Sequence, residues 1–155
     1  MKAWIGAAVV ALSLGASDGS AQVPASMDNA FVGSWTADLA QSKLRPNSHI
    51  TSATLVFSVT PEAVSITDSV IDGGQQVGHG TTVFQTDGKE HPHDELAPGM
   101  MVVALWRSSR RLETTLKWNG QTDTVTYDVS SDGKTLTNRV LGRLGEQVIV
   151  FKPTP

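Results

Sequence analysis

Short runs in which apolar and polar residues alternate make up most of this chain. The run 51–59 places Leu55 and Phe57 on one face of an extended strand, because successive strand side chains point to opposite sides. Such alternation is typical of an antiparallel sheet with one buried and one solvated face. The pattern predicts about nine strands. They lie at residues 33–37, 51–59, 63–71, 77–86, 100–107, 110–118, 121–130, 134–143 and 146–152.

Turn signals separate these strands, notably Asn119-Gly120, Asp132-Gly133 and Asp87-Gly88. Each pair favours a hairpin, because a type I′ turn needs a positive φ at both central residues. Consecutive hairpins build a meander, and a long meander removes its exposed edges by closing. We therefore predict an all-β fold, a closed antiparallel up-and-down barrel of about eight to nine strands.

Two stretches break the alternation. Residues 38–44 predict a short helical turn, which Asp38 would cap through its side-chain oxygen. Residues 89–99 predict the longest irregular loop, and function on a barrel usually lies on such loops.

The N-terminal residues have the three parts of a secretory signal. Lys2 supplies the positive charge, residues 4–14 the apolar stretch, and Gly19-Ser20-Ala21 a small-residue cleavage site. We expect residues 1–21 to be a signal peptide, 22–30 a tether and 31–155 the barrel. This predicts an exported protein, periplasmic or secreted, and a retained N-terminal anchor is the alternative.

Composition narrows the classes of partner. A formal net charge of −3 gives no basic footprint for nucleic acid. The absence of cysteine excludes disulfides and thiolate chemistry. Beyond residue 21 no apolar run reaches the ~20 residues of a membrane-spanning helix, so we expect no transmembrane segment in the mature chain.

The segment Phe31-Val32-Gly33-Ser34-Trp35 resembles the first-strand signature of the calycin superfamily, the lipocalins and fatty-acid-binding proteins. Together with Asp38 to Lys43, Asp87-Gly88-Lys89 and residues 131–136, it is similar to small exported lipocalin-like proteins of bacteria, over residues 31–152. The resemblance implies a lipocalin-like barrel with an apolar cavity. It implies that Gly33 allows a close approach and that Trp35 plugs the closed end. It also implies a basic residue lying over Trp35, with Lys152 as the best match and Arg139 second.

No catalytic set is recognisable in the sequence. There is no Gly-x-Ser-x-Gly elbow and no phosphate-binding loop. The segment His91-Pro92-His93-Asp94-Glu95, with His79 on a neighbouring strand, contains ligand types that suit zinc. Adjacent loop residues rarely converge on one point, so we predict no metal, no cofactor and no catalytic residue, and interpret this segment as a polar loop at the barrel mouth.

Candidate binding residues are the large or polar side chains expected to face the interior. These are Leu55, Phe57, Ile66, His79, Phe84, Trp106, Leu116, Tyr127 and Arg139. The apolar members would line a cavity or fill a packed interior, since the bore of a small barrel suits either. Tyr127, His79 and Arg139 would orient the polar end of a ligand.

Three functions remain open at this point. The first is non-covalent binding of a small hydrophobic or amphipathic molecule inside the barrel. The second is an enzyme of isomerase, cyclase or hydratase type acting on a hydrophobic substrate, with His79 or Tyr127 transferring a proton. The third is an envelope-associated interaction module with a filled barrel. The oligomeric state is not determined by the sequence, and fold alone does not choose among the three.

Overall fold

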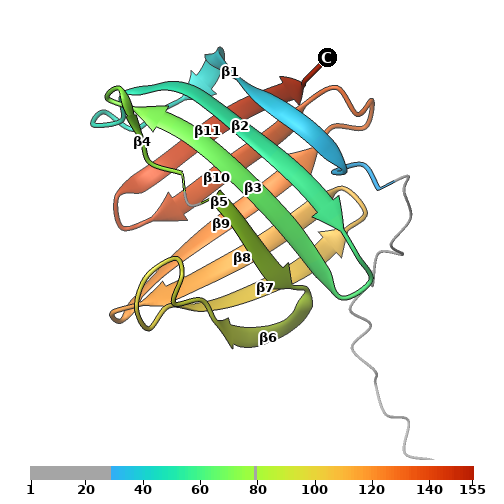
Figure 1. The fold of residues 1–155 in the computed structure, drawn as a ribbon, viewed down its shortest axis with the longest axis vertical. Coiled ribbons are helices and arrows are strands. Elements are labelled where there is room, and N and C mark those ends of the chain that lie inside the picture. The colour runs from blue at the N-terminus through green and yellow to red at the C-terminus, as the bar shows by residue number, and fades with distance from the viewer. Residues whose placement is uncertain (1–28, 79) are drawn as a thin grey trace, which may run out of the picture.

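The computed structural model describes residues 29–78 and 80–155. The predicted signal peptide 1–21, the tether up to residue 28 and His79 therefore lie outside the described residues. The described residues form a single antiparallel up-and-down sheet of 11 strands and contain no helix (Figure 1). It follows that nothing in the described part of the chain has the length and apolar character of a membrane-crossing helix.

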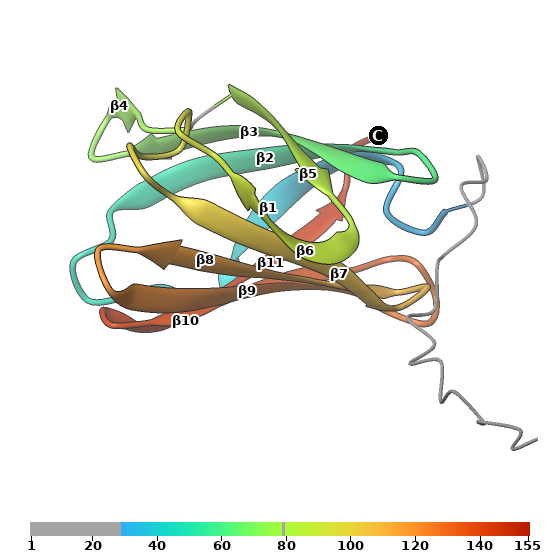
Figure 2. The same ribbon diagram turned by 90° about the horizontal axis from the view of Figure 1, so that it is seen from below.

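The strands follow one another as a meander. Their bounds are β1 Gly33–Lys43, β2 Ile50–Val59, β3 Ala63–Asp72, β4 Gln75–Gln76, β5 Gly80–Gln85, β6 Asp87–Pro92, β7 Met101–Ser108, β8 Arg111–Trp118, β9 Gln121–Val129, β10 Leu136–Gly142 and β11 Gly145–Pro153. The strands pair in the order β4-β3-β2-β1-β11-β10-β9-β8-β7-β6, and β5 pairs with β3. The sheet curls so that β2 and β3 lie across from β8, β9 and β10 (Figure 2).

Alternation correctly predicted most of these strands and their buried faces. On β2 the side chains of Leu55 and Phe57 are buried, as expected from the run 51–59. The predicted type I′ hairpin is also confirmed, because Asn119 and Gly120 have φ values of 49° and 71° and join β8 directly to β9.

The prediction of a closed barrel of about eight to nine strands is wrong in two respects. The described residues form 11 strands, because the chain between β3 and β7 is divided into the short strands β4, β5 and β6, and the sheet is not closed by hydrogen bonds. Among the described residues no hydrogen-bonded ladder joins the two ends of the sheet, which are formed by β4 and β5, both paired with β3, and by β6. The chain itself crosses between them at Thr86: Gln85 is opposite Ala63 of β3, whereas Asp87 is opposite Leu105 of β7. Asp87-Gly88 is thus not the hairpin turn predicted. It lies where one extended segment changes partner, and the two halves then diverge.

The predicted helical turn at 38–44 is also wrong, since β1 continues to Lys43. Asp38 is opposite Val150 and Lys43 is opposite Val148, so β1 bulges between these positions. Ser42 Oγ donates to the Asp38 carbonyl at 2.8 Å and accepts from the Val150 amide at 2.9 Å. The bulge interrupts the alternation, and pairing with β11 outweighs the capping tendency of Asp38.

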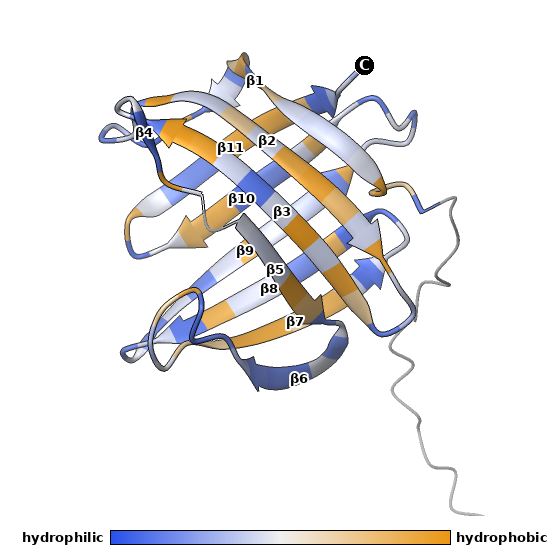
Figure 3. Ribbon diagram, viewed as in Figure 1, coloured by the Kyte–Doolittle hydropathy of each residue, from blue (hydrophilic) through white to orange (hydrophobic). Residues whose placement is uncertain are grey.

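The irregular loop predicted at 89–99 begins with a strand that alternation does not mark. Strand β6 is hydrophilic along its length (Figure 3) and pairs only with β7. An edge strand of this kind buries neither face, so it carries no apolar period. The predicted strand 77–86 is shorter in the structure, where β5 begins at Gly80 and ends at Gln85, and the two-residue β4 precedes the predicted range.

Aromatic side chains close one end of the curled sheet. Phe31, which precedes β1, is fully buried, and its ring centroid lies 5.5 Å from that of Phe57 and 5.1 Å from that of Trp106. Trp35 is buried beside it and donates its indole N–H to the Phe31 carbonyl at 2.9 Å. We call Phe31, Trp35, Phe57 and Trp106 the base plug. The chain before β1 is fixed by Asn29, whose Oδ1 accepts from the Phe31 amide at 2.9 Å.

Two roles implied by the family resemblance are not found. Lys152 is directly opposite the exposed Thr36, so it shares the outer face with Thr36 and not the inner face of Trp35. A Cβ on Gly33 would meet nothing within 4 Å, so no close approach requires this glycine. Glycine is instead required by the backbone φ of +126°, because residues with a side chain rarely adopt that conformation.

The base plug predicts a large effect of Phe31→Ala. Removing this buried ring is expected to lower the free energy of unfolding by about 3–5 kcal/mol. Urea denaturation followed by tryptophan fluorescence measures it. The neighbouring Val32→Ala is the matched control, because Val32 is 44% exposed and its truncation should change stability by less than about 0.5 kcal/mol. Equal stability of the two variants would show that Phe31 is not part of the plug.

Candidate functional site

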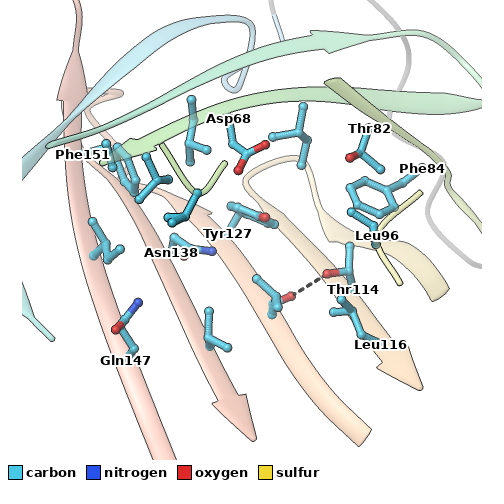
Figure 4. Close-up of a pocket in the computed structure, with 18 of the residues that line it drawn as sticks. Asp68, Thr82, Phe84, Leu96, Thr114, Leu116, Tyr127, Asn138, Gln147 and Phe151 are labelled. Atoms are coloured by element: carbon cyan, nitrogen blue, oxygen red, sulfur yellow. Dashed lines mark hydrogen bonds between the residues drawn. The ribbon is translucent and has the colours of Figure 1, made fainter. Parts of the chain in front are cut away.

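Beyond the base plug the interior is not filled by side chains. It contains a cavity of about 420 Å³, within the range of about 300–1,000 Å³ typical of ligand pockets. Most of the wall is apolar: Ile50, Ala53, Leu55, Ile66, Val70, Val77, Phe84, Leu96, Met100, Leu116, Val125, Val140, Ile149 and Phe151. The polar lining residues are Asp68, Thr82, Thr114, Tyr127, Asn138 and Gln147 (Figure 4).

Five of the predicted binding residues line this cavity: Leu55, Ile66, Phe84, Leu116 and Tyr127. Their alternation placed them on the inner face. Contact with a ligand stays a prediction for each of them. His79 lies outside the described residues.

Three other predicted residues do not line the cavity. Phe57 and Trp106 face the interior but belong to the base plug. Arg139 is wrong in orientation, because the inward positions of β10 are its neighbours Asn138 and Val140. It is exposed and donates to Glu146 at 2.7 Å on the outer surface.

A carboxylate and a phenol face each other across the cavity. Asp68 comes from β3 and Tyr127 from β9, on opposite sides of the curled sheet (Figure 4). The Tyr127 ring packs edge-on against Phe57 at 5.5 Å, so it lies directly on the base plug. Burial, and secondarily the negative charge of Asp68, raise the pKa of Tyr127. Tyr127 is therefore a neutral phenol near neutral pH, suited to hydrogen bonding.

Neutral polar groups complete the inner surface. Asn138 is buried and directly opposite Tyr127 in the β9–β10 ladder. Thr114 Oγ1 donates to the Val125 carbonyl at 3.4 Å, and Gln147 Oε1 accepts from the Arg45 amide at 3.3 Å.

Sequence analysis missed these polar groups, although their positions carried a signal. Asp68 lies on the same face of β3 as Val64, Ile66 and Val70, because every second residue of a strand points to the same side. Asn138 likewise lies on the same face of β10 as Leu136 and Val140. A polar residue on the apolar face of a strand marks such a position.

Residues His93–Met100, which we call the mouth loop, cover part of the opening with Leu96 and Met100. The His93 amide donates to the Met100 carbonyl at 2.8 Å, which closes the loop at its ends. The buried His93 ring lies 5.1 Å from the ring of Phe84. Trp118 Nε1 donates to the Pro98 carbonyl at 3.0 Å. These contacts attach the loop to β5 through Phe84 and to the end of β8 through Trp118.

The histidines of this region are paired with separate carboxylates. His91 Nε2 is 2.9 Å from Asp87 Oδ1, and His93 Nδ1 bonds to Glu95. Within residues 29–78 and 80–155 no three His, Cys, Asp or Glu side chains gather as a metal site would require.

No protein-family model and no curated protein matches this sequence. Solved structures match the fold. An SAHS (abundant heat soluble) protein from Ramazzottius varieornatus aligns with a TM-score of 0.60 at 10% identity, over 81% of this chain and 96% of that chain. The wild-type fluorescent protein UnaG aligns with a TM-score of 0.56 at 14% identity, over 80% of this chain and 97% of that chain. A Schistosoma mansoni fatty acid binding protein in complex with arachidonic acid aligns with a TM-score of 0.54 at 11% identity, over 81% of this chain and 97% of that chain. The calycin-like fold is therefore confirmed, while identities this low say nothing of the ligand.

The His93–Glu95 pair makes the stability of the mouth pH-dependent. The hydrogen bond from His93, more than any other contact, lowers the pKa of the Glu95 carboxyl below its ordinary value. A depressed folded-state pKa stabilises the fold above the unfolded pKa of about 4.3, and this contribution is lost as pH falls through the folded value.

Glu95→Gln is therefore expected to melt below the unaltered protein by a few degrees at most at about pH 6, because the Glu95 carboxylate is exposed to solvent. The difference should shrink as the pH falls below about 4.3, the unfolded-state pKa of the carboxyl. Melting temperatures across this range measure it, with Glu62→Gln at the exposed β2–β3 turn as the control. A gap that stays constant with pH would contradict the assignment.

Proposed function

We propose that this protein binds a small hydrophobic or amphipathic molecule non-covalently inside the barrel. The observation that carries the proposal is the cavity of about 420 Å³, walled largely by apolar side chains above a closed base. Moving the apolar surface of a ligand out of water contributes about 25 cal/mol per Å², less the cost of immobilising the ligand. The driving force is thus desolvation, and the polar lining residues would set the orientation.

The arrangement of the two ends supports binding of one molecule at a time. The base plug blocks one end with buried rings, whereas the mouth loop covers part of the other end through Leu96 and Met100. A ligand would enter beside Leu96 and Met100 and stop at Tyr127, which rests on the plug. A structural neighbour described in complex with arachidonic acid supports an apolar ligand as a class.

The two alternatives have less support. A filled interaction module loses its basis, because the interior contains a cavity. Proton transfer by Tyr127 is disfavoured, because burial and Asp68 keep it a phenol and oppose its use as a base. His79, the other candidate base, lies outside the described residues.

The proposal includes an address outside the cytoplasm, periplasmic or secreted. It rests on the signal-like pattern of residues 1–21 alone.

Filling the cavity from within tests the proposal. Val125→Trp places an indole in the cavity and should weaken binding of a neutral environment-sensitive dye, N-phenyl-1-naphthylamine, by about tenfold or more. The Kd comes from titration of dye fluorescence. Val56→Trp is the matched control, because Val56 lies on β2 with its side chain outward, 42% exposed, and should leave the Kd unchanged.

Absence of saturable dye binding to the unaltered protein, repeated with retinoids and fatty alcohols, would defeat the proposal. Equal weakening by the two tryptophan variants would move the site out of the cavity.

A further inference from the structure

Two polar side chains face the cavity from neighbouring strands. Asn138 on β10 is directly opposite Tyr127 on β9, and both side chains line the cavity (Figure 4). Residues that are directly opposite in an antiparallel ladder have Cβ atoms about 4.5–5.5 Å apart. One small group of a ligand can therefore reach both the Tyr127 hydroxyl and the Asn138 amide. We call these two residues the polar pair.

The side chains of the polar pair make no hydrogen bond within the described part of the chain. Asn138 is only 9% exposed, so its amide is nine-tenths buried. A buried amide is normally hydrogen-bonded, because burial without a partner costs free energy. An oxygen atom of a ligand would supply the missing partner, since it can accept from the Asn138 N–H and from the Tyr127 O–H.

The polar pair carries no charge near neutral pH. The amide of Asn138 does not ionise, and burial raises the pKa of Tyr127, which keeps its proton. A neutral oxygen needs only hydrogen bonds, whereas a buried charge also needs a partner of opposite charge. Asp68, across the cavity, already interacts within the protein and is not counted as a partner for the ligand. A carbonyl or hydroxyl oxygen is therefore the group that matches the pair.

The polar pair lies at the closed end of the cavity. Tyr127 packs edge-on against Phe57 of the base plug, with ring centroids 5.5 Å apart. A ligand oxygen bound here points away from the mouth. The apolar remainder of the ligand then extends past the aliphatic wall toward Leu96 and Met100.

A further polar group without a partner lies at a different level of the wall. Among the described residues Arg45 Nε is buried and unpaired, beside Gln147, whose Oε1 accepts from the Arg45 amide at 3.3 Å. Gln147 is opposite Val140, two residues along β10 from Asn138. Arg45 Nη2 donates to the Gly145 carbonyl at 2.9 Å, and Arg45 itself does not line the cavity. Arg45 is thus the competing anchor for the polar end of a ligand.

We propose that the polar pair binds a neutral carbonyl or hydroxyl oxygen, so that amphipathic molecules of this class occupy the cavity with their polar end at the base. The inference rests on the proposed function and specifies the ligand class and its orientation. Each hydrogen bond to the oxygen is expected to contribute about three- to tenfold in affinity.

Two probes that share one ring system test the proposal. These are 2-acetylnaphthalene and 2-ethylnaphthalene, of which only the first has a carbonyl oxygen. Each competes against N-phenyl-1-naphthylamine for the purified protein. Tyr127→Phe and Asn138→Leu each remove one donor and keep most of the side-chain shape. Each should weaken binding of 2-acetylnaphthalene by about three- to tenfold and change that of 2-ethylnaphthalene by less than about twofold.

Two control variants should leave the Kd of both probes unchanged. Thr137→Val is the matched control, because Thr137 precedes Asn138 but lies on the other face of β10. Arg45→Met removes the competing anchor. The infrared carbonyl stretch of bound 2-acetylnaphthalene is a direct readout, because hydrogen bonding lowers its frequency. This frequency should rise in both polar-pair variants and stay constant in both controls.

The outcomes separate the two proposals. Unchanged binding of 2-acetylnaphthalene in both polar-pair variants would overturn the role of the pair and leave cavity binding intact. Equal weakening of both probes would also overturn it, because the two residues would then only shape the cavity. A loss confined to Arg45→Met would place the oxygen at the β1–β2 loop instead. Failure of the dye and both probes to bind the unaltered protein would overturn the proposed function itself.

Discussion

The burial of Phe31 between Phe57 and Trp106 is the contact on which the cavity depends. A curled sheet has two open ends, and water entering from both would leave a wet channel. With one end stopped by aromatic rings, the apolar residues above it form a pocket. The bond from the Trp35 indole to the Phe31 carbonyl ties this ring to the first strand. Phe31, two residues before the Gly-x-Trp segment, therefore contributes to closing this end as much as Trp35 does.

Polar side chains lie among the apolar residues of the inner wall. Burying a polar group costs free energy unless a partner satisfies it, and an all-apolar interior would avoid that cost. Asp68 and Asn138 nevertheless occupy inward positions among Ile66, Val70 and Val140. Under the proposed function such groups would orient the polar end of a ligand, which apolar side chains alone cannot do.

Strands with regular alternation of apolar and polar residues were predicted from the sequence, whereas segments that interrupt this alternation were not. Alternation identified the inner faces of β2 and β8, and Asn119-Gly120 identified the type of hairpin turn at β8–β9. The bulge after Asp38 and the hydrophilic edge strand β6 have no period, and pairing that is distant in sequence determines them. A similar limit applies to the cavity residues. Alternation along a strand shows that a residue faces the interior, but it does not show how far from the closed end that residue lies. Phe57 was therefore predicted for the cavity and lies in the plug.

The two ends of the barrel, the base plug and the mouth, are held by interactions of different strength. At the corner formed by Thr86, β5 leaves β3 and β6 joins β7, so the two ends of the sheet meet there and diverge away from it (Figure 1). The mouth loop crosses that wider side through hydrogen bonds such as Trp118 to Pro98, each contributing about 1 kcal/mol. The plug is held by buried rings whose removal costs several times more. Opening the mouth therefore requires far less free energy than opening the base, so exchange of a ligand need not disturb the interactions that keep the fold together.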